Sequence, residues 1–76
     1  MFVVKKLKME ESILRNNIRL HRLRMGYSQE YMAIQLDISQ YAYHKIESGK
    51  TALKVTTLLE ISEILELDVQ RLFDTV

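Results

Sequence analysis

The tripeptide Gly49-Lys50-Thr51 is the stretch of this sequence closest to a known chemical motif, because it matches the end of a phosphate-binding loop. That motif also needs a glycine at position 44, where this chain has a histidine, and no strand is predicted before it. His21 and His44 fall on different predicted helices without carboxylates at ligand spacing, so no metal site is expected. No nucleophile and base form a recognisable pair. The sequence therefore predicts a protein that is not an enzyme and binds no cofactor.

Size and composition restrict the remaining functions. The chain has 76 residues, of which 47% are hydrophobic and 28% charged, the balance of one small globular domain. It has no cysteine, which excludes disulfides and thiolate ligands and suits a reducing compartment. No apolar run reaches the length of a membrane span. We therefore expect a cytoplasmic protein without a membrane anchor.

The charges are distributed unevenly along the chain. Residues 1–50 contain nine Lys and Arg against five acids, whereas residues 51–76 contain two against five, so a net charge of +1 hides a basic and an acidic part. This asymmetry is typical of a small domain that turns one side to a polyanion, although two solvated faces of unequal charge would give the same count.

The elements that carry these residues are predicted to be helices. Proline is absent, and glycine occurs only at positions 26 and 49, each placed to end a helix. Ser28 and Ser39 are good N-caps for two short helices, and a fourth helix is predicted from about Val55 to Leu65. A short closing helix follows Asp68. The sequence thus predicts an all-α bundle of five helices in residues 12–76.

The first eleven residues are harder to assign from local pattern. Phe2-Val3-Val4 favours a short strand, and the lysines that follow favour a basic arm. We therefore expect residues 1–11 to form an N-terminal arm or a short strand outside the helical domain.

The second and third helices have the properties of a helix-turn-helix. Each has about eight residues and they share a turn of about three, so their geometry must come from packing. Ala33 places a methyl group where a second helix must cross closely, and Ile38, Tyr43 and Ile46 fill the space between the two helices.

Three stretches with their spacing resemble the lambda-repressor-like, or Cro/cI-type, helix-turn-helix family. They are Ser28-Gln29-Glu30-Tyr31-Met32-Ala33, Leu36-Asp37-Ile38-Ser39-Gln40 and Lys45-Ile46-Glu47-Ser48-Gly49-Lys50. The resemblance spans about residues 17–73 and implies a double-stranded DNA-binding regulator of transcription, most often a repressor. The chain departs from the family pattern mainly in helix ends and helix one, at Asp37, Leu53, Glu66 and His21.

The resemblance implies that the third helix enters the major groove, with its N-terminal residues at base edges. Helical geometry places four residues opposite Tyr43 and Ile46, and these are the expected base-reading residues: Gln40, Tyr41, His44 and Lys45. Glutamine pairs with adenine through two hydrogen bonds, and lysine donates to guanine or phosphate.

Phosphate contacts are expected on both sides of that helix. Ser28 and Gln29 lie at a helix N-terminus, where free N–H groups favour an anion. Ser48, Lys50 and Thr51 follow the third helix. By resemblance, Arg22 and Glu47 form a partly buried ion pair whose role is structural.

The sequence is compatible with two partners besides DNA. A homodimer would double the number of base pairs read, through Leu59, Ile64, Leu67 and Phe73 or through pairing of Phe2-Val3-Val4 as strands. The alternative function is that of an antitoxin, which binds a toxin protein and regulates its own operon. Apolar residues off the predicted core face, such as Ile13 and Leu23, suit either a partner or a thin core.

Overall fold

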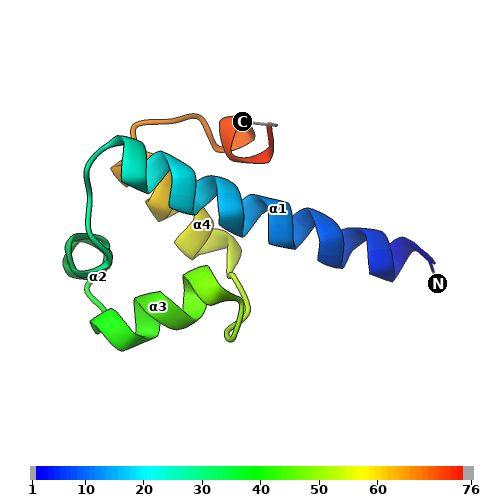
Figure 1. Ribbon diagram of the computed structural model, residues 1–76, viewed down its shortest axis with the longest axis horizontal. Coiled ribbons are helices and arrows are strands. Elements are labelled where there is room, and N and C mark those ends of the chain that lie inside the picture. Colours follow the sequence, from blue (N-terminus) through cyan, green and yellow to red (C-terminus); the bar gives the residue numbers. More distant parts are fainter. Residues whose placement is uncertain (1, 75–76) are drawn as a thin grey trace.

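A computed structural model describes the backbone of residues 2–74 and the side chains of residues 10–74. Every element in this part of the chain is helical (Figure 1). The elements in order are α1 (Phe2–Arg24), α2 (Gln29–Leu36), α3 (Gln40–Ser48), α4 (Val55–Ile64) and the 3-10 helix η1 (Val69–Phe73). The prediction of an all-α fold is confirmed. The fifth predicted helix is a single stretch of 3-10 helix, so residues 2–74 contain four α-helices.

The N-terminal segment differs from the prediction. Residues 2–11 form no strand, because α1 begins at Phe2 and continues without a break to Arg24. No glycine or proline interrupts this stretch, and residues 5–11 are mostly Lys, Leu, Met and Glu, which are strong helix formers. A strand also needs a neighbouring strand, and the described residues form none.

Serine caps and left-handed residues define the ends of the short helices. The Ser28 hydroxyl accepts a hydrogen bond from the Tyr31 N–H at 2.9 Å, and the Ser39 hydroxyl accepts one from the Ala42 N–H at 3.0 Å. Four residues with positive φ end the four α-helices: Gly26, Asp37, Gly49 and Glu66. After each of them, the next backbone N–H donates to the carbonyl five residues earlier, as in a Schellman motif.

The core lies where all five elements meet. Its fully buried residues are Leu14, Ile18, Met32, Ala33, Tyr43, Ile61, Leu65 and Leu72. Ala33 is 2% exposed, which agrees with its predicted role at the crossing of α2 and α3. Phe73, which the sequence analysis placed on a possible dimer surface, is 54% exposed.

Asn17 fastens the C-terminal 3-10 helix to α1. Its amide nitrogen donates to the carbonyls of Leu72 at 2.8 Å and Asp74 at 2.7 Å, and the residue is only 3% exposed. These two hydrogen bonds satisfy carbonyl groups at the end of η1, because the last carbonyls of a helix have no hydrogen-bond partner within it. Among the described helices, none is long and apolar enough to span a membrane.

Candidate nucleic-acid interface

The turn between α2 and α3 fixes the direction of α3. Asp37 adopts a left-handed conformation with φ 58° and ψ 44°, and the N–H of Ile38 donates to the Ala33 carbonyl at 3.0 Å. Ser39 then caps the first turn of α3. Because both ends of this turn are hydrogen-bonded, α3 leaves α2 in one defined orientation.

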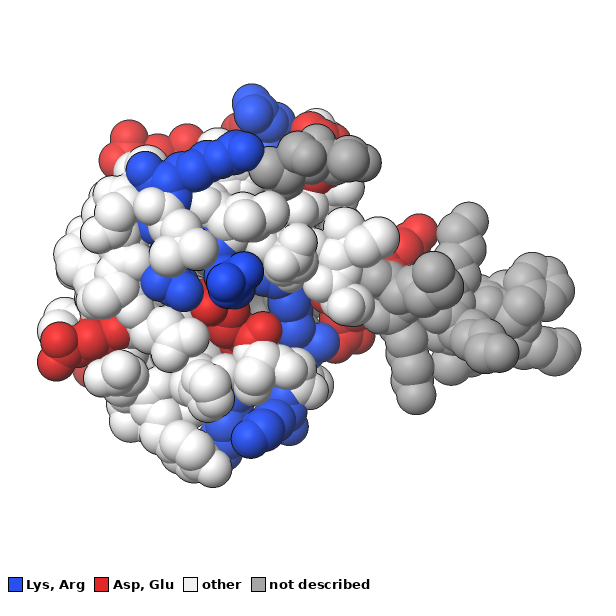
Figure 2. All heavy atoms as spheres, in the orientation of Figure 1, with Lys and Arg blue, Asp and Glu red and all other residues white. Residues whose placement is uncertain are grey.

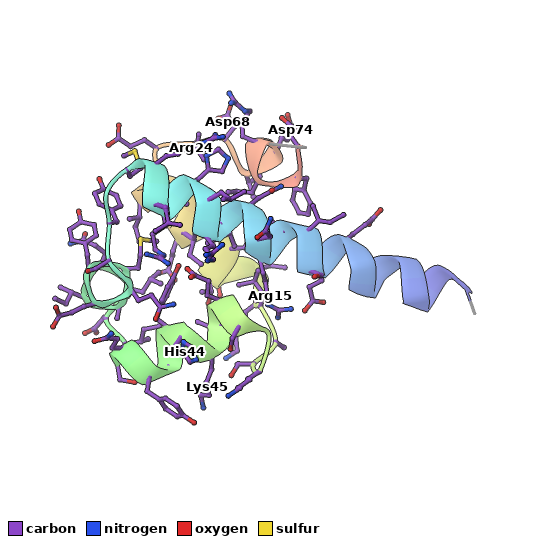
Figure 3. All side chains as sticks on the ribbon, viewed as in Figure 1. Arg15, Arg24, His44, Lys45, Asp68 and Asp74 are labelled. Atoms are coloured by element: carbon purple, nitrogen blue, oxygen red, sulfur yellow. The ribbon has the colours of Figure 1, made fainter. Side chains whose placement is uncertain are left out.

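The outer face of α3 carries the four residues expected to read bases. Gln40, Tyr41 and His44 are exposed, Lys45 is partly exposed, and Tyr43 on the opposite face is fully buried. The Lys45 ammonium lies 5.0 Å from the centre of the Tyr41 ring, a cation–π distance. Figure 3 shows Lys45 projecting from α3 on the side away from α1. The structure therefore brings these polar side chains together on one exposed surface.

A buried network behind α3 holds its inner face. The Arg22 guanidinium donates to both carboxylate oxygens of Glu47, each at 2.9 Å, and the two side chains are 9% and 4% exposed. The Tyr43 hydroxyl donates to Glu47 Oε2 at 2.6 Å, and Arg22 also donates to the Tyr27 carbonyl at 2.8 Å. The network thus ties α3 to α1 and to the residue before Ser28.

The protonation states in this network follow from its contacts. Burial alone would raise the pKa of Glu47, but hydrogen bonds from Arg22, Tyr43 and Gln29 outweigh burial and lower that pKa. Burial and the bond to Glu47 raise the pKa of the Tyr43 phenol, so it stays a donor. The same carboxylate raises the pKa of Arg22. Glu47 is therefore a carboxylate that accepts from three side chains at once.

Gln29 takes part in this network as well as lying at the predicted phosphate site. Its amide nitrogen donates to Glu47 Oε1 at 3.2 Å, and it is the first residue of α2. Ser28, immediately before it, is exposed and uses its hydroxyl as the N-cap. Gln29 thus links the start of α2 to the inner face of α3.

The segment after α3 carries the other predicted phosphate contacts. Ser48, Lys50 and Thr51 are all exposed, and the N–H groups of Lys50 and Thr51 donate to the Lys45 carbonyl at 2.9 and 3.2 Å. Figure 2 shows basic side chains along the lower edge of the molecule, where Figure 1 places α3. The predicted phosphate residues therefore lie at the start of α2 and beyond the end of α3.

Arg15 is a residue of this region that the sequence analysis missed. It donates from Nε to the Ile46 carbonyl and from Nη2 to the Thr51 carbonyl, both at 2.9 Å, and it forms a 2.6 Å ion pair with Glu11. Figure 3 shows it between α1 and the end of α3. It lies seven residues before Arg22, which is two turns along the same side of α1. This spacing was the feature of the sequence that could have indicated that Arg15 faces α3 as Arg22 does.

The fold and this surface define a helix-turn-helix DNA-binding domain. A family model described as "Helix-turn-helix" matches residues 18–72, well over half of the chain. The chain belongs to this family, in its Cro/cI-type, lambda-repressor-like form. Neither the comparison with curated proteins nor that with solved structures found a significant match. The family is one of DNA-binding regulatory domains, so the chain is a DNA-binding regulator of transcription.

Proposed function

We propose that the protein is a sequence-specific repressor that binds double-stranded DNA with α3 in the major groove. The observation that carries the proposal is the pair of faces on α3. Gln40, Tyr41 and His44 are exposed on one side of α3, and Tyr43 and Glu47 are fixed in the bundle on the other side. A helix held in this way enters the groove without changing its orientation.

Each exposed residue of α3 has a defined chemistry toward DNA. The Gln40 amide pairs with adenine N6 and N7, which makes it the main base-reading residue. The Tyr41 ring contacts a thymine methyl group, while Lys45 and His44 donate to guanine or to phosphate. Because Tyr41 and Lys45 stack on each other, they present one combined surface rather than two independent side chains.

Phosphate contacts on both sides fix the position of α3. Ser28 and Gln29 bind one phosphate at the start of α2, where the backbone N–H groups and the helix dipole favour an anion. Ser48, Lys50 and Thr51 bind another beyond α3. These contacts contribute affinity without base preference. Occupying the operator is enough to exclude competing proteins, which is why repression is the proposed outcome.

The proposed binding unit on DNA is a homodimer. One such domain reads only about four or five base pairs, too few to select a site in a genome. A two-fold pair reads two half-sites about 34 Å apart on a palindrome.

An antitoxin role is the second candidate, and exposed apolar residues favour it. Ile13, Leu23 and Leu59 are each 50% exposed and lie on α1 and α4 rather than on α3. A toxin protein would cover such residues. The candidate requires that co-expression of this chain relieves the toxicity of a protein encoded beside it, and it fails if no such protein is found.

Selection of bound duplexes from a random pool tests the proposal. We expect a palindromic consensus whose affinity falls linearly with the logarithm of salt concentration, with a slope of about −0.9 for each phosphate contact. Gln40→Ala should relax the preference at one base pair of each half-site. Recovery of no consensus, or an affinity that does not respond to salt, would contradict the proposal.

A further inference from the structure

The segment between α3 and α4 carries proposed phosphate contacts, yet packing does little to hold it. Residues 48–52 are all exposed, and residues 49–54 lie between the two helices. The N–H groups of Gly49, Lys50 and Thr51 donate to carbonyls in the last turn of α3, which holds the start of the segment. An exposed segment held only at its start is easily opened. Its shape therefore depends on what else holds its backbone.

Arg15 of α1 supplies a second attachment for this segment. Its Nε donates to the Ile46 carbonyl in α3, and its Nη2 donates to the Thr51 carbonyl in the segment, both at 2.9 Å. A Cβ atom added at Gly49 would lie 3.6 Å from Nη1, so the guanidinium also lies against the end of α3. Among the described side chains, Arg15 is the one that hydrogen-bonds the backbone of residues 49–54. One planar group thus joins α3 to the segment that follows it.

The surroundings of Arg15 suit this attachment better than direct contact with DNA. Its Nη1 forms a 2.6 Å ion pair with Glu11, and its side chain is only 12% exposed. Each of its three nitrogen atoms is therefore engaged with an oxygen of the protein. The groove of about 470 Å³ that Arg15 lines also contains Glu11 and Glu47. Two carboxylates disfavour a phosphate in that groove, because like charges repel.

We propose that Arg15 is a positioning residue for DNA binding, which holds the backbone of Lys50 and Thr51 in the shape that meets a phosphate. The inference rests on the proposed phosphate contacts of this segment and adds a residue that does not itself touch DNA. A segment that is ordered before binding loses less conformational freedom on binding, so the same contacts give a higher affinity. Because phosphate contacts carry no base preference, Arg15 contributes equally on every duplex.

Backbone order in the full chain without DNA tests the positioning itself. Arg15→Lys keeps the charge but loses the planar fork of donors that joins two carbonyls. We expect the NMR order parameters of the Lys50 and Thr51 amides to fall in this variant, while those of α3 stay unchanged. Circular dichroism checks that helix content is kept. Unchanged order at Lys50 and Thr51 would overturn the proposal, whether or not the protein binds DNA.

Arg24→Lys is the matched control for this measurement. It makes the same chemical change at an exposed arginine of α1, which Figure 3 shows on the side of that helix away from α3. The order parameters of Lys50 and Thr51 should stay at their wild-type values in this variant. An equal fall in both variants would overturn the proposal, since the effect would not depend on the two hydrogen bonds of Arg15.

Affinity for the selected duplex tests whether this order matters for DNA binding. Arg15→Lys and Arg15→Met should weaken binding equally, by about five- to tenfold, because both lose the fork that orders the segment. Base preference should stay as in the wild type. A loss in Arg15→Met alone would show that the charge of Arg15 acts directly on a phosphate, and it would overturn the proposal.

A combined variant tests whether Arg15 acts through the segment. In Lys50→Ala/Thr51→Ala the side chains that Arg15 positions are gone, so adding Arg15→Lys should weaken binding further by no more than about twofold. Losses that multiply in full would overturn the proposal, because Arg15 would then act independently of the segment. If Lys50→Ala/Thr51→Ala itself leaves binding unchanged, the phosphate contacts of the proposed function are wrong, and the inference falls with them even where the order parameters respond.

Discussion

The inner face of α3 is packed against the bundle, whereas the outer face of the same nine-residue helix is exposed. The inner face holds Tyr43 at 0% exposure and commits the Glu47 carboxylate to three side-chain donors. The outer face leaves Gln40, Tyr41 and His44 exposed to solvent. A side chain can read a base only if its own helix does not move, so the inner face supplies rigidity and the outer face supplies chemistry. Changes to the inner face should therefore alter stability, and changes to the outer face should alter selectivity.

The largest effect is expected for Tyr43→Ala. Truncating a fully buried aromatic residue costs about 3 to 5 kcal/mol, a large share of the stability of a domain of this size. Urea unfolding measures the loss. Tyr43→Phe is the matched control, since it keeps the ring and removes only the hydrogen bond to Glu47, at a cost of about 1 kcal/mol. Equal losses in the two variants would show that the ring itself contributes nothing.

Breaking the ion pair from one side should cost nearly as much. Glu47→Ala leaves the Arg22 guanidinium buried without its counter-charge, which typically costs about 3 to 5 kcal/mol. Replacing both residues with apolar ones, as in Arg22→Met/Glu47→Leu, should be less destabilising than Glu47→Ala. If the double variant is less stable than Glu47→Ala, the network contributes more to stability than the mutual compensation of two buried charges.

Acid should destabilise the fold in two steps. Burial of His21, together with the nearby Arg24 and Arg71, lowers its pKa below the usual value of about 6.5. As the pH drops through about 6.5, the unfolded chain therefore takes up a proton before the folded one does, and the free energy of unfolding falls. The pKa of Glu47 is also lowered, and the stability it contributes is lost as the pH falls below 4.5 toward its folded value. Unfolding free energies measured from pH 8 to pH 3 should show both steps. His21→Leu should remove only the upper one.

The outer face should respond in DNA binding rather than in stability. Gln40→Ala is expected to lower the preference for one base pair by about 1 to 3 kcal/mol, since it removes a bidentate contact. Lys50→Ala should weaken all duplexes equally and reduce the salt slope by about one contact. Competition binding with single-base variants of the selected site measures both. A uniform effect of Gln40→Ala across all duplexes would place that residue on the DNA backbone instead.

Local patterns in the sequence were enough to predict the elements around α3. Ser28, Ser39 and Gly49 each act on backbone groups within a few residues, so their types alone predict the caps and the helix end. Arg22 and Glu47 are 25 residues apart and came from the family resemblance rather than from local rules. The face of α3 followed from helical periodicity once Tyr43 was assigned to the core.

The interactions that sequence reasoning missed depend on packing. Arg15 donates to carbonyls 31 and 36 residues away, and Asn17 to carbonyls 55 and 57 residues away. A backbone carbonyl looks the same in every residue, so nothing in the sequence marks these partners. The strand predicted for Phe2-Val3-Val4 was wrong for a different reason. The β-propensity of these three residues was outweighed by helix propagation from the residues that follow them.

The smallest predicted effect compares the two kinds of helix end. Gly26 and Gly49 take the left-handed conformation freely, whereas Asp37 and Glu66 hold it at φ 58° with a Cβ atom present. A left-handed residue other than glycine destabilises the folded state by about 1 to 2 kcal/mol. Replacing it with glycine removes this strain, but part of the gain is lost because glycine gives the unfolded chain more conformational freedom. Asp37→Gly and Glu66→Gly should therefore each stabilise the domain, by about 0.5 to 1 kcal/mol. Thermal unfolding measures the gain, with Asp37→Ala as the control that keeps the Cβ atom and should give none.

Because Asp37 precedes α3 and Glu66 does not, the two glycine variants also sharpen the comparison between the two faces of α3. If the strain at Asp37 helps to set the angle of α3, Asp37→Gly should stabilise the protein and still weaken DNA binding. Glu66→Gly should then stabilise it and leave DNA binding unchanged.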